Sequence, residues 1–343
     1  MKNTSINKTD QVIDANLDRA REGLRVIEEW SRFNIDDLDI ATRLKDWRQR
    51  LGVLHKRDYK FSRDLESDIG LGLTHPAQKN RNSSDELISS NCSRVQEALR
   101  VIEEFSRNYN PLLSKTSNEI RYGLYEMEIH ILRHSIRSKR LEKLKYCRLC
   151  LITSNQENLI DIVKESLKGG TRMVQYRCKE KSDLSKYEEA KILCKLCKDS
   201  NSLFIVNDRI DIALSVNADG VHLGQNDLPT KVVRKLIGSD MLIGRSTHSS
   251  KEIISSEEED INYLGIGPVF KTESKPNLKS LGIEKLKGII PITKLPIFAI
   301  GGINESNIKK IKEIGIKKVA VIGSIMNAKD PKESTKNLIQ ALQ

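Results

Sequence analysis

Two aspartates in the C-terminal half of the chain have the residue type and setting of a divalent-cation site. Asp208 closely follows the apolar run 203–206, and Asp227 closely follows the apolar run 220–223. If these runs are neighbouring parallel strands, both carboxylates lie at the carboxyl edge of the sheet. Carboxylates and substrate phosphates together are the ligands that Mg2+ prefers. The spacing therefore predicts a Mg2+ site at Asp208 and Asp227.

Cationic side chains follow an earlier apolar run, 172–177. Side chains alternate along an extended chain, so Gln175, Arg177 and Lys179 point the same way. Two cations on one side of a strand end indicate an anionic ligand. A later loop ending in Lys275 contributes a further cation. Metal and cations together predict a diphosphate site.

Two glycine-containing loops predict a separate phosphate site. Gly301 and Gly302 follow the run 297–300, and Gly323 follows the run 319–322. Glycine lets backbone N–H groups approach an anion, and the N-terminus of a following helix favours negative charge. The alternative is that these glycines only turn the chain, but two such loops in succession favour phosphate binding.

Eight short apolar runs alternate with amphipathic helical stretches in the C-terminal half, which is the pattern of parallel βα units. Eight such units in about 200 residues predict a closed (β/α)8 TIM barrel, with its chemistry at the carboxyl ends of the strands. A doubly wound open sheet is the alternative, but no G-x-G-x-x-G follows the first strand. The expected strands are 148–153, 172–177, 203–206, 220–223, 242–244, 263–267, 297–300 and 319–322, and helices include 159–168, 184–198, 229–236 and 304–314.

The N-terminal half carries an internal repeat. Residues 13–33 and 88–108 lie 75 positions apart and are identical at 12 of 21 positions. Both copies have helical spacing of apolar residues, and a further helical stretch follows each, at 40–56 and 117–138. Two helix pairs predict an all-α bundle preceding the barrel. The expected domains are 1–137 and 146–343, joined by a basic helical linker at 138–145.

Six polar positions recur in both copies of the repeat. One interpretation is a lattice of i,i+3 and i,i+4 ion pairs on a solvated face. The other is that both sets converge across a pseudo-two-fold axis on a phosphate or a metal. The segment between the copies, with Arg63, Asp64, Asp68 and Gly70, could hold a metal–phosphate or supply turn and cap residues. The recurring residues are Asn16, Arg19, Glu22, Arg25, Glu28 and Glu29, and Asn91, Arg94, Glu97, Arg100, Glu103 and Glu104.

The composition bears on partners and location. The net charge of +11 is spread along the chain and aromatic residues make up only 5%, which favours a small anionic substrate over nucleic acid. No apolar run approaches the ~18 residues of a membrane helix, and residues 1–10 lack an apolar signal core. We therefore expect a cytoplasmic protein with no membrane or nucleic-acid partner, and the oligomeric state stays open.

The cysteines and histidines indicate no further chemistry. Two C-x2-C pairs, Cys147/Cys150 and Cys194/Cys197, have zinc-ligand spacing, but neither lies in a glycine-rich knuckle. Free, reduced cysteines are the simpler expectation for a cytosolic protein. The chain has no G-x-S-x-G elbow or evident Ser/His/Asp triad, and His222 lies inside a strand, where a structural role is expected.

Residues 146–343 resemble the thiamine-phosphate synthase family through five motifs in order. Each motif is weak alone, and the ordered set is specific. The chain departs from the family pattern at Lys271, where proline is frequent, at Ser274, where threonine is common, and at Gly323, where serine is frequent. The motifs are Gln175–Lys179 (Q-[FY]-R-x-K), Asn207–Asp208 (N-D), Asp219–Asp227 (D-G-[VI]-H-[LV]-G-Q-x-D), Gly267–Lys275 (G-P-[IV]-[FY]-x-T-x-[ST]-K) and Ile300–Ile303 (I-G-G-I).

The resemblance implies a reaction and a site. A pyrimidine diphosphate, 4-amino-2-methyl-5-(diphosphooxymethyl)pyrimidine, would condense with 4-methyl-5-(2-phosphoethyl)thiazole, or its carboxylated form, to give thiamine monophosphate and diphosphate. One Mg2+ would bind Asp208 and Asp227. Arg177, Lys179, Ser246 and Lys275 would act in catalysis. The implied substrate residues are Gln175, Tyr176, Arg177, Cys178, Lys179, Asn207, Ser246 and Lys275 for the pyrimidine diphosphate, and Thr272, Glu273, Ser274, Gly302, Ile322 and Gly323 for the thiazole phosphate.

Other functions fit parts of this pattern. A sugar-phosphate isomerase barrel would share the phosphate loops, but the carboxylate pair and Lys275 argue against it. A regulatory protein could bind the same phosphates without turnover, but it would not need metal chemistry at Asp208 and Asp227.

Residues 10–137 resemble the helical domain fused ahead of thiamine-phosphate synthase in some bacteria, through the EALRVIEE-like repeats and the Arg63-to-Gly70 stretch. That domain has been assigned to hydroxymethylpyrimidine-phosphate kinases of a second, non-ribokinase type. The resemblance implies ATP as a partner, although the sequence has no Walker A pattern. The alternative is a structural or regulatory module.

Overall fold

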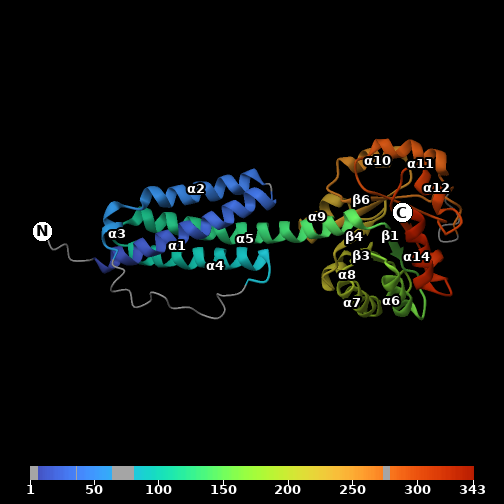
Figure 1. The fold of residues 1–343 in the computed structure, drawn as a ribbon, viewed down its shortest axis with the longest axis horizontal. Helices are drawn as coiled ribbons and strands as arrows, with labels where there is room; N and C mark the ends of the chain where they lie inside the picture. Colours follow the sequence, from blue (N-terminus) through green and yellow to red (C-terminus); the bar gives the residue numbers. More distant parts are fainter. Residues whose placement is uncertain (1–6, 36, 64–80, 273–278) are drawn as a thin grey trace. The chain divides into compact units, whose positions relative to one another are not determined.

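The computed structural model describes residues 7–35, 37–63, 81–272 and 279–343. The chain divides into two compact units, Met1–Ser135 and Ile136–Gln343, and each is described by itself (Figure 1). In the described ranges no helix is both long and apolar enough to cross a bilayer.

The first unit is a bundle of four long helices. The first copy of the repeat forms α1 (Lys8–Trp30), which ends in a π-helical turn, Ser31–Ile35, and the second copy forms α4 (Ser84–Ser106). The side chains of Asn7 and Ser83 cap these helices by accepting backbone N–H bonds. The remaining helices are α2 (Leu38–Leu54), the short α3 (Arg57–Phe61) and α5 (Pro111–Tyr146).

The two copies of the repeat pack directly against each other. A Cβ at Gly23 of α1 would lie 2.5 Å from Cγ2 of Val95 in α4, so the close approach of the helices requires glycine there. The equivalent position in the second copy is the buried Ala98. Leu17 and Leu24 of α1 lie fully buried in the same core. The duplicated helices thus form the centre of this unit.

The second unit is a closed barrel of eight parallel strands in sequence order, in which β1 also pairs with β8. Together with the duplicated helical unit, it confirms the expected fold class, a TIM barrel preceded by an all-α domain. The strands are β1 (Leu149–Ile152), β2 (Met173–Tyr176), β3 (Leu203–Asn207), β4 (Gly220–Leu223), β5 (Leu242–Thr247), β6 (Tyr263–Ile266), β7 (Ile297–Ile300) and β8 (Val319–Val321).

Helices cover the outside of the barrel, and alternate strand residues fill its inside. Met173, Leu203, Leu242 and Phe298 belong to the inner cluster. A short additional helix, α13 (Gly323–Met326), follows β8. The covering helices are α6 (Leu159–Gly169), α7 (Asp183–Asp199), α8 (Ile210–Ser215), α9 (Thr230–Ile237), α10 (Ser250–Glu257), α11 (Ile283–Ile289) with a 3-10 turn at Ile290–Ile292, α12 (Ile308–Glu313) and α14 (Pro331–Leu342).

The last turns of α5 close the amino end of the barrel. Leu144 and Cys147 are buried in the inner cluster. Nζ of Lys318, just before β8, donates to the carbonyl oxygens of residues 144, 145 and 147 at 2.6–2.8 Å. Arg140 of α5 pairs with Asp219 and Asp240 at the entrances to β4 and β5. Residues 138–145, expected as a helical linker, are therefore part of α5.

Candidate active site

A cavity of about 820 Å3, partly open to solvent, lies inside the barrel at the carboxyl ends of the strands. Residues from all eight strands line it. Its lining combines apolar groups from inside the barrel with polar groups that follow the strands. The polar residues lining it are Gln175, Arg177, Asn207, His222, Ser246, His248, Tyr263 and Thr272.

The end of β2 presents alternate residues to opposite sides. Gln175 and Arg177 line the cavity, as expected from the alternation. Tyr176 instead lies in the outer core, where its hydroxyl donates to Oε2 of Glu189 in α7 at 2.8 Å. Cys178 packs against the same outer core. The structure therefore does not bring the side chains of Tyr176 and Cys178 to the cavity, since both have the wrong parity along the strand.

Asp208 and Asp227 are brought together after β3 and β4. Asp208 adopts a left-handed backbone conformation (φ 63°), and its N–H donates to the carbonyl oxygen of His222 at 2.9 Å. Burial and the adjacent Asp227 carboxyl raise the pKa of Asp208 to about 6, although Arg177 and Lys179 oppose the shift. The pair is thus a site where a proton or a cation relieves repulsion.

The donor set around this pair fits Mg2+ bound with a substrate. Among the described residues, no group of three or more His, Cys, Asp or Glu side chains could hold a metal by itself. Two carboxylates leave coordination positions for phosphate oxygens and water, which is how Mg2+ commonly binds beside a phosphorylated substrate. Arg177 and Lys179 lie close enough to Asp208 to affect its charge.

Ser246 is oriented by a buried pair that the sequence analysis did not connect with the site. Nε2 of His222 lies 2.9 Å from Oγ of Ser246, and its Nδ1 lies 3.2 Å from the hydroxyl of Tyr263. Gly244 makes room for this pair, because a Cβ there would lie 2.5 Å from Nδ1 of His222. His222 lies inside a strand, as expected, but it also lines the cavity and positions a predicted substrate residue.

His248 lines the cavity without forming a catalytic triad. Its Nδ1 is hydrogen-bonded to the carbonyl oxygen of Gly267. Glu252 accepts a bond from the backbone N–H of His248 at 2.7 Å, and this contact leaves the ring unaffected. Among the described residues, no carboxylate is hydrogen-bonded to the His248 ring.

The loops after β7 and β8 form an adjoining cavity of about 920 Å3. Gly302 has φ 64°, and a Cβ there would lie 2.4 Å from a carbonyl oxygen, so only glycine fits. Gly323 begins α13, the short extra helix that recurs at the phosphate sites of such barrels. Thr272 and Ile322 line both cavities. Glu273, Ser274 and Lys275 lie outside the described residues.

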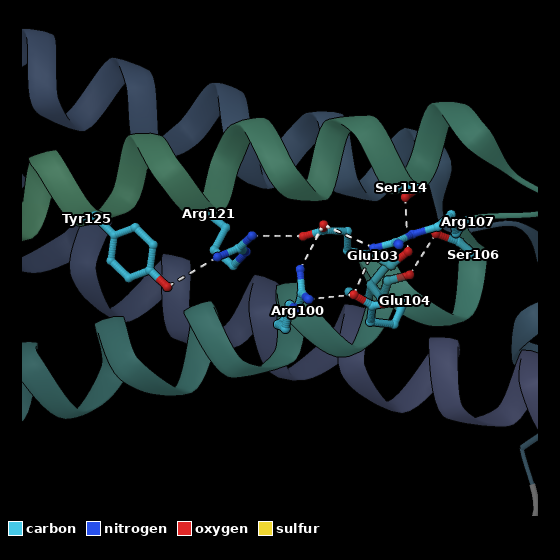
Figure 2. A network of polar contacts seen from close by, with 9 residues as sticks. Arg100, Glu103, Glu104, Ser106, Arg107, Ser114, Arg121 and Tyr125 are labelled. Carbon is cyan, nitrogen blue, oxygen red and sulfur yellow. Dashed lines mark hydrogen bonds and ion pairs between the residues drawn. The ribbon is translucent and has the colours of Figure 1, made fainter.

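In the helical unit, half of the duplicated polar set forms ion pairs, and Figure 2 shows those of the second copy. Glu103 lies between Arg100, at 3.0 Å, and Arg121 of α5, also at 3.0 Å. Burial opposes ionisation of Glu103, but hydrogen bonds from Arg121 and Asn118 and the charges of Arg121 and Arg100 outweigh it, so its pKa lies below the ordinary value. These contacts fit the interpretation as an ion-pair lattice.

The first copy repeats this arrangement. Glu28 pairs with Arg25 at 3.3 Å and with Arg48 of α2 at 2.8 Å. Arg63 pairs with Asp14 and Asp18 of α1 at 2.6 and 2.5 Å. Asp64, Asp68 and Gly70, named as candidates for a metal–phosphate, lie outside the described residues.

Known proteins are similar to this chain over nearly its whole length. Residues 149–325 match the family model described as thiamine monophosphate synthase, and residues 11–130 match the ThiD2 family. A thiamine-phosphate synthase of Prochlorococcus marinus is 55% identical over 333 residues, which cover 97% of this chain and 96% of that protein. The chain belongs to the thiamine-phosphate synthase family.

Other members of the family show the same extent of similarity. A thiamine-phosphate synthase of Parasynechococcus marenigrum is 49% identical over 97% of this chain and 95% of its own length. The solved thiamine phosphate pyrophosphorylase of Pyrococcus furiosus is 35% identical, with a TM-score of 0.54. It covers 59% of this chain and 96% of its own, so the likeness is to about the length of one of the two units.

Proposed function

We propose that the barrel, residues 146–343, is a transferase that makes thiamine monophosphate. The methylene carbon of the pyrimidine diphosphate would form a bond to the thiazole nitrogen while its C–O bond to the diphosphate breaks. The observation that carries this proposal is the geometry of two adjoining cavities. One is lined by Arg177, whose charge acts on Asp208 of the adjacent pair Asp208–Asp227, although neither aspartate is among the residues lining that cavity. The other is built on Gly302 and Gly323.

Each part of the site would have a distinct task. Asp208 and Asp227 would hold one Mg2+, which when bound neutralises diphosphate charge. Arg177, Lys179 and Lys275 would stabilise the departing diphosphate. Ser246 would bind the pyrimidine in the orientation that His222 gives it. The electron-rich aminopyrimidine can carry positive charge at its methylene, so departure can precede attack and no protein nucleophile is needed.

The remaining predicted substrate residues divide between the two cavities. Gln175 and Asn207 would contact the pyrimidine diphosphate in the first cavity. Thr272, Gly302, Ile322 and Gly323 would bind the thiazole phosphate in the second. Glu273 and Ser274 are retained as candidates for the same phosphate on the resemblance alone.

We further propose that the helical domain, residues 1–137, supplies the pyrimidine diphosphate, with residues 138–145 joining it to the barrel. A phosphate oxygen of the pyrimidine monophosphate would attack the γ-phosphorus of ATP, and ADP would leave. The match of residues 11–130 to the ThiD2 family supports this activity over a purely structural role. The six free cysteines are consistent with a cytoplasmic location, where thiols stay reduced.

The test uses the full chain with Mg2+ and the thiazole phosphate. Wild-type protein should make thiamine monophosphate from pre-made pyrimidine diphosphate, and also from pyrimidine monophosphate plus ATP. Asp208→Asn and Asp227→Asn should each lower kcat with the diphosphate at least about 100-fold. Asp199→Asn, which removes an exposed aspartate from α7, is the matched control and should retain wild-type activity.

The two halves of the proposal can fail separately. Full activity of Asp208→Asn would remove that residue from the metal site. Synthesis from pre-made diphosphate but none from monophosphate plus ATP would remove the kinase activity and leave the synthase in place.

A further inference from the structure

An open groove of about 1500 Å3, partly filled by solvent, lies along α1 and α4 in the helical unit. Its lining includes charged side chains from both copies of the repeat that the ion-pair lattice does not use. All of its lining belongs to the first compact unit. The lining residues are Asn16, Arg19, Glu22, Arg81, Ser90, Ser93, Arg94, Glu97, Ala98 and Val101.

The charges in this groove are related by the internal duplication. Arg19 and Glu22 of α1 correspond to Arg94 and Glu97 of α4, which lie 75 positions later. The two helices pack closely at Gly23, so equivalent side chains from both copies reach the same groove. Duplication has therefore produced one site with two arginines and two glutamates, rather than two separate sites.

These groups differ from the rest of the duplicated set in their pairing. Arg100, which lies further along α4, forms ion pairs with Glu103 and Glu104. Arg94 and Glu97 have the i,i+3 spacing that allows such a pair, yet within the described residues neither has a hydrogen-bonding or ion-pair partner. Arg19 has one long bond, at 3.4 Å, to Oδ1 of Asn16. The guanidinium donors of both groove arginines remain available to a ligand.

Hydroxyl groups and a further cation make the groove asymmetric. Ser90 and Ser93 of α4 line it, where the first copy has Ala15 and Asp18. Arg81 adds a third guanidinium to the lining. Arg81 has an interaction of its own, so the availability of donors rests on the two related arginines, Arg19 and Arg94. The unequal lining suits an anion that is itself asymmetric.

We propose that this groove binds the phosphate group of a phosphate ester. The inference rests on the kinase activity proposed above, and its two candidate ligands are ATP and the pyrimidine monophosphate. Arg19 and Arg94 contact phosphate oxygens from opposite sides, because the planar guanidinium donates two hydrogen bonds to such a group. Glu22 and Glu97 accept a Mg2+ that accompanies a phosphate chain.

The experiment compares three full-length proteins by isothermal titration calorimetry, with Mg-ATP and with pyrimidine monophosphate in separate titrations. Arg19→Gln/Arg94→Gln removes the two related groove cations. Arg25→Gln/Arg100→Gln removes two cations at the equivalent lattice positions, on the same helices and with the same change of charge. The barrel is identical in all three proteins, so a difference between them reports on the helical unit.

We expect wild type to bind at least one of the two ligands, and we expect the lattice variant to bind that ligand with the same affinity. The groove variant should bind that ligand at least tenfold more weakly, and the ligand affected identifies which phosphate ester occupies the groove. Equal affinity of the groove variant and wild type for both ligands would overturn the proposal, as would no binding by wild type or an equal loss in the lattice variant.

A parallel assay follows ADP formation and, separately, synthesis from pre-made diphosphate. Selective ligand binding at the groove in a wild-type chain that transfers no phosphoryl group would refute the kinase activity while supporting the groove as a phosphate site. Phosphoryl transfer that the groove variant retains in full, with unchanged binding, would refute the groove and support the kinase. Both variants should retain synthesis from the pre-made diphosphate.

Discussion

Removal of Arg121 should destabilise the helical unit far more than removal of a surface arginine from the same network. Arg121 lies on α5 with its side chain only 10% exposed, and its Nη2 lies 3.0 Å from Oε2 of Glu103, which is 9% exposed (Figure 2). Arg121→Met keeps most of the buried side-chain volume but leaves the Glu103 carboxylate without that partner.

The magnitude follows from what remains around Glu103. Breaking a buried pair by removing one partner costs roughly 3–5 kcal/mol when the other charge is left uncompensated. Here Arg100 and Arg107 still lie 3.0 and 3.6 Å from the other carboxylate oxygen, and Asn118 still donates a hydrogen bond. Both arginine side chains are 54% exposed, so the compensation is partial. We therefore expect Arg121→Met to lower the free energy of unfolding of the unit by about 2–3 kcal/mol.

The two tryptophans of the chain allow this unit to be followed alone. Trp30 and Trp47 both lie in the first unit, so intrinsic tryptophan fluorescence during urea unfolding reports on the bundle and is silent for the barrel. With a typical slope near 2 kcal/mol per molar urea, the midpoint should fall by about 1–1.5 M. Arg100→Met is the matched control and should cost less than about 1 kcal/mol, because its pairs are at the surface.

Equal losses for Arg121→Met and Arg100→Met would refute the reasoning, as would a loss below about 0.5 kcal/mol for Arg121→Met. The duplication supplies an independent check. Arg48→Met leaves Glu28 without a contact of 2.8 Å from a side chain that is 17% exposed. This variant should behave like Arg121→Met.

Four further outcomes are expected. Gly302→Ala should raise KM for the thiazole phosphate at least tenfold in steady-state assays, whereas Gly288→Ala, with nothing within 4 Å of the new Cβ, should leave it unchanged. Tyr176→Phe should lower the free energy of unfolding by about 1 kcal/mol, because it removes the hydrogen bond to Glu189, without changing KM for the pyrimidine diphosphate. A changed KM would indicate that the Tyr176 side chain contacts this substrate. Because its pKa is lowered on folding, Glu103 stabilises the protein above the ordinary glutamate pKa of 4.5, so the urea-midpoint difference between wild type and Glu103→Gln should shrink as pH falls below that value. Because the pKa of Asp208 is raised to about 6, protons compete with Mg2+, so the thermal shift caused by Mg2+ should be smaller near pH 5 than near pH 7.5, and an equal shift would argue against binding there.

The barrel could be predicted from the sequence because its signals are local. Each strand is a short apolar run between turn residues, and the expected run 203–206 became β3 (Leu203–Asn207) with one residue added. The proximity of the two carboxylates could also be predicted, because strand order alone places Asp208 beside Asp227. The short helix α3 was missed, since five residues carry too little periodicity to be recognised.

Contacts between side chains that are distant in the sequence could not be predicted in this way. The alternation that places Gln175 and Arg177 at the cavity also directs Tyr176 away from it, but the family motif includes Tyr176 whatever its side of the strand. The link from His222 to Ser246 depends on the register of β4 with β5. By contrast, Arg100 has glutamates at both i+3 and i+4, whereas Arg94 has only Glu97 at i+3, so the sequence already favours ion pairs at Arg100.

The pairing of β1 with β8 has a consequence for the order of folding. Leu149 pairs with Val319, so β1 has an unpaired edge until nearly the whole chain has been synthesised. Lys318 imposes the same delay on the end of α5, because its three carbonyl acceptors gain their donor only then. The helical unit needs nothing beyond residue 135 and can form on the ribosome much earlier. Barrel closure should therefore be the last and slowest step, because it joins the most distant segments of its unit.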